Sequence, residues 1–98
     1  MITVLIRHKV ADFTKFKPAF DSAFQFRQTN GVESYKMFRN LHDANDVTVM
    51  LSFPSADDAQ KFVASDALRT RMKEGGVVGE PTIQLLAEAY MARRTSAD

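Results

Sequence analysis

The sequence predicts an α+β fold, with one four-stranded antiparallel sheet and helical segments packed against one of its faces. Four segments are rich in β-branched residues or alternate apolar and polar positions, which is typical of strands. Two other regions repeat apolar residues at steps of three and four, which is typical of amphipathic helices. In chain order these segments give a β-α-β-β-α-β arrangement.

The first strand is expected over residues 2–8, and a helix is expected over residues 12–28. Pro18 lacks a backbone N–H, so we expect a kink or an irregular first turn near Lys17. The helix is expected to end at Asn30-Gly31, because both residues tolerate a left-handed backbone. The apolar stripe of this helix comprises Phe13, Phe16, Phe20, Ala23 and Phe24.

A hairpin is expected from residues 32–40 and 46–53, joined by a turn at residues 42–45. A second helical region should begin at Ser55, be capped again at Ser65 and stop at Gly75-Gly76. The last strand is expected over residues 82–90, again with period two. The inward side of the second helical region comprises Ala59, Phe62, Val63, Leu68 and Met72.

With right-handed crossovers, this element order is the split βαβ, or ferredoxin-like, arrangement. A chain of 98 residues is long enough for one domain with one core. We expect this domain to span residues 1–92. Residues 93–98 follow no pattern and are expected to form a flexible tail.

Composition excludes several classes of function. Thirteen basic residues against twelve acidic ones leave no electrostatic case for binding nucleic acid. The chain has no cysteine, which rules out disulfides and thiol catalysis and fits a reducing compartment. Two histidines do not make a metal cluster, and we find no flavin, nicotinamide or phosphate-loop motif. Since no apolar run suits a secretory signal or a membrane span, we expect a cytoplasmic protein without a cofactor or a membrane partner.

The two faces of the sheet predict a homodimer. Helices can cover only one face, and a monomer would leave several large apolar side chains of the other face in water. We therefore expect the uncovered face to pair with a second copy across a two-fold axis. The alternative is a solvated face with scattered hydrophobic residues. The residues assigned to this interface are Arg7, Tyr35, Met37, Arg39, Met50, Glu88 and Tyr90.

Three segments resemble the dimeric α/β-barrel superfamily, in particular its small cyclase-like proteins grouped with antibiotic biosynthesis monooxygenases. They are residues 7–17 (RHKVADFTKFK), 31–35 (GVESY) and 75–81 (GGVVGEP), and the resemblance extends over residues 2–90. It implies a ferredoxin-like domain that dimerises into an α/β barrel. Phe16 stands where many relatives have Trp, and Pro18 also departs from the common pattern.

His8 is the candidate catalytic residue, since it ends the apolar side of the first strand and titrates near neutral pH. It could act as a general base toward a phenol or enol, or simply bond a backbone carbonyl. The aromatic stripe could line a pocket for a small aromatic ligand, or only form core. The residues assigned to this pocket are Phe13, Phe16, Phe20, Phe24, Phe62, Leu68 and Met72.

Four functions stay open at this point. The first is a cofactor-independent monooxygenase or cyclase acting on a small aromatic substrate, with His8 as the proton acceptor. The second is a non-catalytic binder that uses the same pocket. The third is an isomerase or lactone-forming enzyme at the dimer interface, where Tyr35 and Arg39 would hold an anionic substrate. The fourth is a structural subunit without a pocket.

Overall fold

The computed structural model describes residues 1–93, and its four strands form one antiparallel sheet in the order β2-β3-β1-β4. This is the predicted ferredoxin-like strand order. Of the tail expected over residues 93–98, residues 94–98 lie outside the described part of the chain. The strands are β1 (Ile2–Val10), β2 (Ser34–Asn40), β3 (Asp43–Phe53) and β4 (Val77–Ala87).

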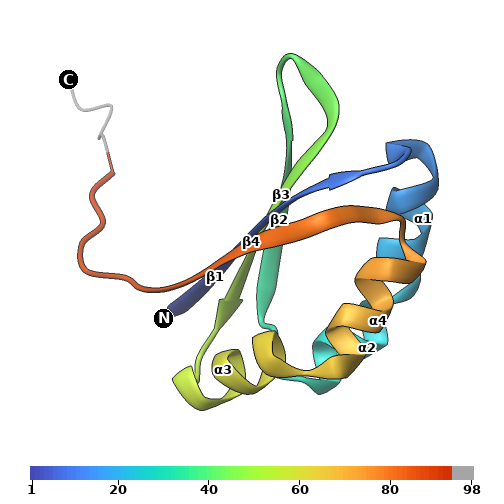
Figure 1. The fold of residues 1–98 in the computed structure, drawn as a ribbon. Helices are drawn as coiled ribbons and strands as arrows, with labels where there is room; N and C mark the ends of the chain where they lie inside the picture. Colours follow the sequence, from blue (N-terminus) through green and yellow to red (C-terminus); the bar gives the residue numbers. More distant parts are fainter. Residues whose placement is uncertain (94–98) are drawn as a thin grey trace.

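The connections between strands carry four helices, which gather on one side of the sheet (Figure 1). Two follow β1 and two follow β3, so the predicted division of the second helical region at Ser65 is confirmed, whereas the first region is also a pair of helices. Within residues 1–93 none of them is long and apolar enough to cross a bilayer. The helices are α1 (Phe13–Ser22), α2 (Phe24–Thr29), α3 (Ala56–Ala64) and α4 (Asp66–Glu74).

The expectation of one helix over residues 12–28 is wrong, and so is the expected position of its irregularity. Helix α1 continues through Pro18, and the interruption comes at Ala23, whose φ of −88° and ψ of 14° leave the helical range. This interruption changes the rotational phase of α2 relative to α1. As a result Phe24, which an unbroken helix would place beside Phe20, is 52% exposed.

The predicted helix starts are confirmed by side-chain caps. The carboxylate of Asp12 accepts a hydrogen bond from the backbone N–H of Thr14 at 3.0 Å, at the start of α1. The hydroxyls of Ser55 and Ser65 accept in the same way at the starts of α3 and α4, each at 3.2 Å. Each cap satisfies an N–H that has no partner within its helix.

Three strands are longer than predicted at one end, and the first of them, β1, continues past residue 8 to Val10. Strand β3 already begins at Asp43, which leaves a two-residue turn at Leu41 and His42. Strand β4 begins at Val77, not at residue 82, and ends at Ala87. Gly76, with φ of 88°, reverses the chain directly from α4 into β4, a conformation that L side chains rarely adopt.

The core lies between the helices and the apolar side of the two central strands, β1 and β3. Phe62 of α3 packs its ring 5.4 Å from that of Phe53, measured between centroids. Each such side chain contributes about 1.5–3 kcal/mol through burial. The largest fully buried side chains are Phe53, Leu51, Val4 and Val47.

The register of β2 corrects the prediction of its two faces. Tyr35, Met37 and Arg39 lie opposite Leu51, Val49 and Val47 of β3. Directly paired residues of antiparallel strands project to the same face. All three therefore lie on the helix-covered face, and their assignment to the open face is wrong.

The face that the helices leave uncovered, here called the open face, instead receives Lys36 and Phe38 from β2. Arg7 and Met50 lie on this face as expected, whereas Glu88 and Tyr90 follow the end of β4. Phe38 is 49% exposed, so a bulky apolar ring does lie in this face. The large apolar residues of the open face are Leu5, Phe38, Met50, Val78 and Leu86.

An ion pair crosses the open face between the central strands. Arg7 donates to both carboxylate oxygens of Asp46, from Nε at 3.1 Å and from Nη2 at 2.7 Å. This hydrogen bond from Arg7 holds the pKa of Asp46 below its usual range, with the burial of the carboxylate opposing the effect.

Candidate functional site

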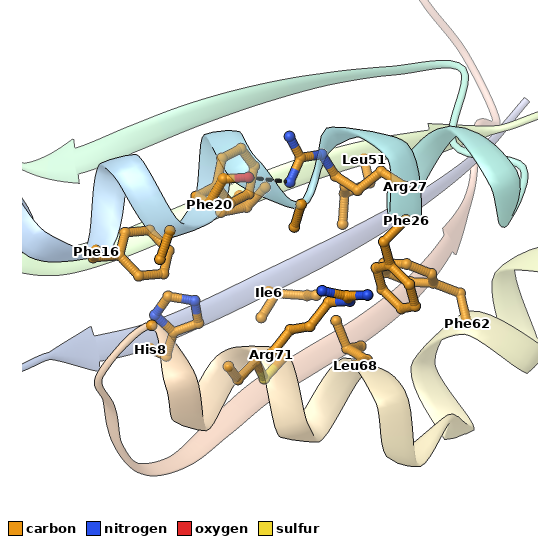
Figure 2. Close-up of a pocket in the computed structure, with 15 residues that line it drawn as sticks. Ile6, His8, Phe16, Phe20, Phe26, Arg27, Leu51, Phe62, Leu68 and Arg71 are labelled. Carbon is orange, nitrogen blue, oxygen red and sulfur yellow. Dashed lines mark hydrogen bonds between the residues drawn. The ribbon is translucent and has the colours of Figure 1, made fainter.

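A cavity of about 70 Å³ lies between the sheet and side chains from all four helices, to which α3 contributes Phe62. Figure 2 shows its walls: β1 at the back, α1 and α2 on one side and α4 on the other. Most of its lining is aliphatic or aromatic, because the helices and the covered side of the sheet turn their apolar side chains toward it. The polar side chains of the lining are His8, Arg27 and Arg71.

The structure brings together most of the predicted pocket residues. His8 lines the cavity, and so do Phe16, Phe20, Phe62, Leu68 and Met72. Phe13 and Phe24 do not. The Phe13 ring instead supports the guanidinium of Arg39 at 3.8 Å from its centroid, at the outer end of α1. Phe24 is turned out by the interruption at Ala23.

His8 is held in the cavity wall by the alternation of β1. Ile6, His8 and Val10 all project to the covered face, and His8 is 6% exposed. The pairing of β1 with β4 shifts register between Arg7 and Lys9, so the irregularity of the sheet falls at His8 itself. Bulges of this kind often lie beside functional side chains, because they change the direction in which a residue projects.

The surroundings of His8 favour a neutral imidazole. Its ring meets the Phe16 ring edge-on, with 5.3 Å between centroids. Burial lowers the pKa of His8 below its ordinary value of 6.5, and the negative charge of Asp46 only partly opposes this effect. Its Nδ1 atom is buried and has no hydrogen-bond partner among the described residues. A neutral ring of this kind can accept a proton from a ligand hydroxyl in the cavity.

The sequence reasoning missed Arg27, the most deeply buried charge of the site, which is 4% exposed. Arg27 follows Phe20 by seven residues, which is close to two helical turns. This spacing could have placed Arg27 on the same side of the predicted helix as the aromatic stripe. Its Nη1 atom donates to the Phe20 carbonyl at 2.7 Å, and its guanidinium lies 3.8 Å over the Phe20 ring. On the other side lies the Tyr35 ring, 4.6 Å from the guanidinium carbon.

Arg71 and Phe26 were also missed, and they form the opposite side of the cavity. The guanidinium carbon of Arg71, from α4, lies 4.3 Å from the centroid of the Phe26 ring on α2. Figure 2 shows Arg71 extending across the space between the two helices. Nothing in the periodicity of α4 distinguishes Arg71 from its exposed neighbours, because its role depends on α2 lying across from it.

The described residues form no cluster of metal ligands. Among residues 1–93 no three His, Asp or Glu side chains lie close enough together to hold a metal ion. The polar groups that line the cavity are the imidazole of His8 and the guanidiniums of Arg27 and Arg71, among aromatic rings.

This is a ferredoxin-like domain with an aromatic cavity between helices and sheet, and several solved structures share its architecture. A proposed antibiotic biosynthesis monooxygenase from Bordetella bronchiseptica superposes with a TM-score of 0.76 at 13% identity, covering 91% of this chain and 97% of that one. For another from Caulobacter crescentus CB15 the TM-score is 0.70 at 20% identity, with 91% and 90% covered.

A variant of SnoaB, a cofactor-independent oxygenase from Streptomyces nogalater, superposes with a TM-score of 0.67 at 15% identity, covering 99% of this chain and 97% of that one. No protein-family model matches the sequence, and no curated protein matches it significantly. The chain thus has the fold of the antibiotic biosynthesis monooxygenase-like proteins, as the sequence resemblance implied. At these identities the likeness establishes the shared fold.

Proposed function

We propose that this protein is a cofactor-independent monooxygenase or cyclase that acts on a small aromatic substrate in the cavity, with His8 as its proton acceptor. The observation that carries the proposal is the buried Nδ1 atom of His8, which has no partner among the described residues and lies in a wall of phenylalanines. Buried polar atoms are nearly always hydrogen-bonded, so an unpartnered one in a cavity is a candidate for contact with a ligand.

In the monooxygenase reaction the substrate itself supplies the electrons. His8 takes the proton of a phenolic hydroxyl, and the resulting phenolate is electron-rich enough to react with O2. One oxygen atom enters the ring to form a quinone. The other leaves as water with the two hydrogens that the phenol loses. For 1-naphthol this balances as one phenol and one O2 giving 1,4-naphthoquinone and one water.

The cavity wall has its own part in such a reaction. Aromatic side chains exclude water, so a phenolate formed beside His8 is not stabilised by bulk solvent and a reactive intermediate is protected from hydrolysis. The similarity in fold to SnoaB, a cofactor-independent oxygenase, also supports this class of chemistry.

We further propose that the functional unit is a homodimer joined through the open face. Leu5, Met50 and Leu86 place apolar side chains there from three neighbouring strands, and Phe38 adds a fourth. Several large apolar side chains on one uncovered sheet face are typical of an interaction site. Pairing two copies would bury these side chains in both.

The alternative of an interfacial isomerase loses its geometric basis. It required Tyr35 and Arg39 on the open face, whereas both lie on the covered one. A non-catalytic binder would use the same cavity as the proposed enzyme, and the test below separates the two.

The test compares His8→Gln with His42→Gln, which changes the exposed histidine of the β2–β3 turn. Oxygen uptake and quinone absorbance are followed with a panel of electron-rich naphthols, beginning with 1-naphthol. Loss of general-base catalysis should lower the rate about 100-fold or more for His8→Gln. The rate of His42→Gln should stay near that of the wild type. Equal rates for the two variants reject the proposal, and saturable binding without product would identify a binder.

A further inference from the structure

An open groove of about 660 Å³ lies between α4 and the edge strand β4, and the proposed reaction does not use it. Its charged lining residues, Arg69, Lys73 and Glu80, are all exposed. Its apolar lining residues are buried or half-buried, so they form its inner surface. These apolar residues are Leu68, Met72, Val77, Pro81 and Ile83.

The groove and the cavity beside His8 share one wall. Leu68 and Met72, one helical turn apart on α4, line both of them. Beneath this wall the sheet is continuous, because Ile6 of the cavity is paired with Ile83 of the groove. Directly paired residues project to the same face, so both isoleucines lie on the covered face. The side chains of Leu68 and Met72 thus form the partition between the cavity and the groove.

One member of this partition is free to move. Leu68 is the buried residue of α4, at 8% exposed, and it anchors the helix to the core. Met72 is half-buried, and its unbranched side chain rotates about three bonds. Met72 can therefore swing aside while Leu68 holds α4 in place.

A bulge in β4 forms the outer wall of the groove at the level of His8. The extra residues of the bulge leave the segment 79–81 outside the ladder with β1, and all three of its residues line the groove. Two steps along β1 face four steps along β4 between the pairs Lys9–Val78 and Arg7–Thr82.

The sequence of the segment 79–81 favours this bulge. Gly79 takes a φ of 74°, which L side chains rarely adopt, and Pro81 has no N–H to donate to the ladder. Bulges of this kind are common beside functional sites. The groove is therefore a feature that the chain builds next to the candidate catalytic residue.

The cavity by itself is too small for an aromatic ring. Its volume of about 70 Å³ is below the roughly 150 Å³ of an engineered cavity that holds benzene. A ring can enter only if part of the lining moves outward. Met72 is a flexible lining residue with open space behind it, and the groove supplies that space.

We propose that the groove is the entrance and the outer half of the ligand site, with Met72 as the side chain that moves aside. The ligand is then a phenol with an extended substituent: its ring lies in the cavity near His8, and its substituent lies along Ile83 in the groove. This inference rests on the proposed function, because the ring must occupy the cavity. It adds the route of entry and the shape of the ligand.

The first experiment compares phenol with 3-butoxyphenol, in which the ring position opposite the hydroxyl stays free for oxidation. NMR titration of the full chain follows two amide signals, that of Gly75 in the cavity and that of Gly79 in the groove. Phenol should shift only the Gly75 signal, and 3-butoxyphenol should shift both. Full burial of one methylene strengthens binding about fourfold, so a partly buried butoxy chain should strengthen it at least about tenfold.

A matched pair of variants on β4 tests the groove. Ile83→Trp fills the groove, so the advantage of 3-butoxyphenol over phenol should fall to about twofold or less. Leu85→Trp is the control, because Leu85 lies on the same face of β4, is 41% exposed and lines neither the groove nor the cavity. Thermal unfolding checks that both variants fold.

A second pair tests the movement of Met72. Met72→Ala removes the side chain that must be displaced, so phenol should associate about fivefold faster, as measured by NMR line shapes. Met37→Ala is the control, since Met37 is also a half-buried methionine on the covered face but lines neither space. A purely structural role for Met72 would lower the unfolding temperature without a faster association.

The outcomes distinguish this inference from the proposed function. If 3-butoxyphenol shifts Gly75 but not Gly79, or if the two tryptophan variants act alike, the inference is overturned while the cavity stays a ligand site for His8 chemistry. Shifts at both glycines, together with normal turnover in His8→Gln, support the inference and remove the proposed catalytic step. If neither phenol shifts Gly75, both proposals fail.

Discussion

Replacing Phe16 by alanine tests the arrangement of the cavity wall, with Phe24→Ala as its matched control. An unbroken helix would place the two rings on one buried stripe, and the interruption at Ala23 separates their environments. Phe16 is 5% exposed and Phe24 is 52% exposed. The same chemical change should therefore cost very different amounts of stability.

The expected magnitudes follow from burial. A buried Phe→Ala change costs about 3–5 kcal/mol, and we expect the lower end because one side of the Phe16 ring faces the cavity rather than packed atoms. The Phe16 ring also loses its contacts with His8 and Phe20, at centroid distances of 5.3 and 5.9 Å. Phe24→Ala should cost about 1 kcal/mol or less, since half of its surface is already in water and alanine favours a helix.

Urea unfolding followed by circular dichroism measures both free energies. The free energies of unfolding of Phe16→Ala and Phe24→Ala should differ by about 2 kcal/mol. With a slope of about 1.5 kcal/mol per molar urea, the midpoint of Phe16→Ala should lie more than about 1 M below that of Phe24→Ala. The reasoning is refuted if the two midpoints coincide, because a continuous helix that buries both rings would then describe the protein better.

Three more predictions concern pH, assembly and backbone. Burial lowers the pKa of His8 in the folded protein below 6.5, so the unfolded chain takes up a proton first as the pH falls, and the free energy of unfolding decreases below about pH 6.5. In His8→Gln the loss of stability between about pH 7.5 and about pH 5, measured as the shift in urea midpoint, should be smaller than in the wild type. The same shift in both proteins would contradict this prediction. Phe38→Glu on the open face should convert the proposed dimer to a monomer in sedimentation, whereas Leu41→Glu at the 96% exposed turn should not; a wild-type monomer at micromolar concentration would remove the dimer altogether. Gly31→Ala would place an alanine at a φ of 91°, with its Cβ 2.9 Å from Oδ2 of Asp58. Thermal unfolding should therefore show a loss of stability of about 1–2 kcal/mol or more. An unchanged unfolding midpoint would show that this turn can rearrange.

Local sequence signals were sufficient for the order of the elements and for the faces of the two central strands. One side of β1 and of the later part of β3 is almost entirely apolar, and an error of one residue in register would put that side in water. The caps at Asp12, Ser55 and Ser65 were predictable because each requires only a short side-chain oxygen and a free N–H nearby.

Strand β2 shows why the rest could not be predicted in this way. Its two sides are similarly mixed, with Tyr35, Met37 and Arg39 on one and Lys36 and Phe38 on the other. Hydrophobicity alone therefore does not choose between the two registers. The choice is made by the short turn at residues 41 and 42 and by the irregular pairing near Asn40.

The candidate site divides in the same way. His8 and three of the pocket phenylalanines, Phe16, Phe20 and Phe62, follow from strand alternation and helical spacing, which are properties of single elements. Arg71 and Phe26 meet only because α4 and α2 cross the same side of the sheet. Contacts between elements distant in sequence have no local signal.

By itself the sequence determined the order of strands and helices, the apolar face of the central strands and the placement of His8 in that face. These features depend on the period of side chains along one element, which is the same in every fold. Only the tertiary structure decided that α1 breaks at Ala23, that Tyr35 faces the helices and that two arginines enter one apolar cavity. Each of these features depends on how separate elements pack against one another. The packing energy comes from contacts between elements, so no single segment of the sequence determines it.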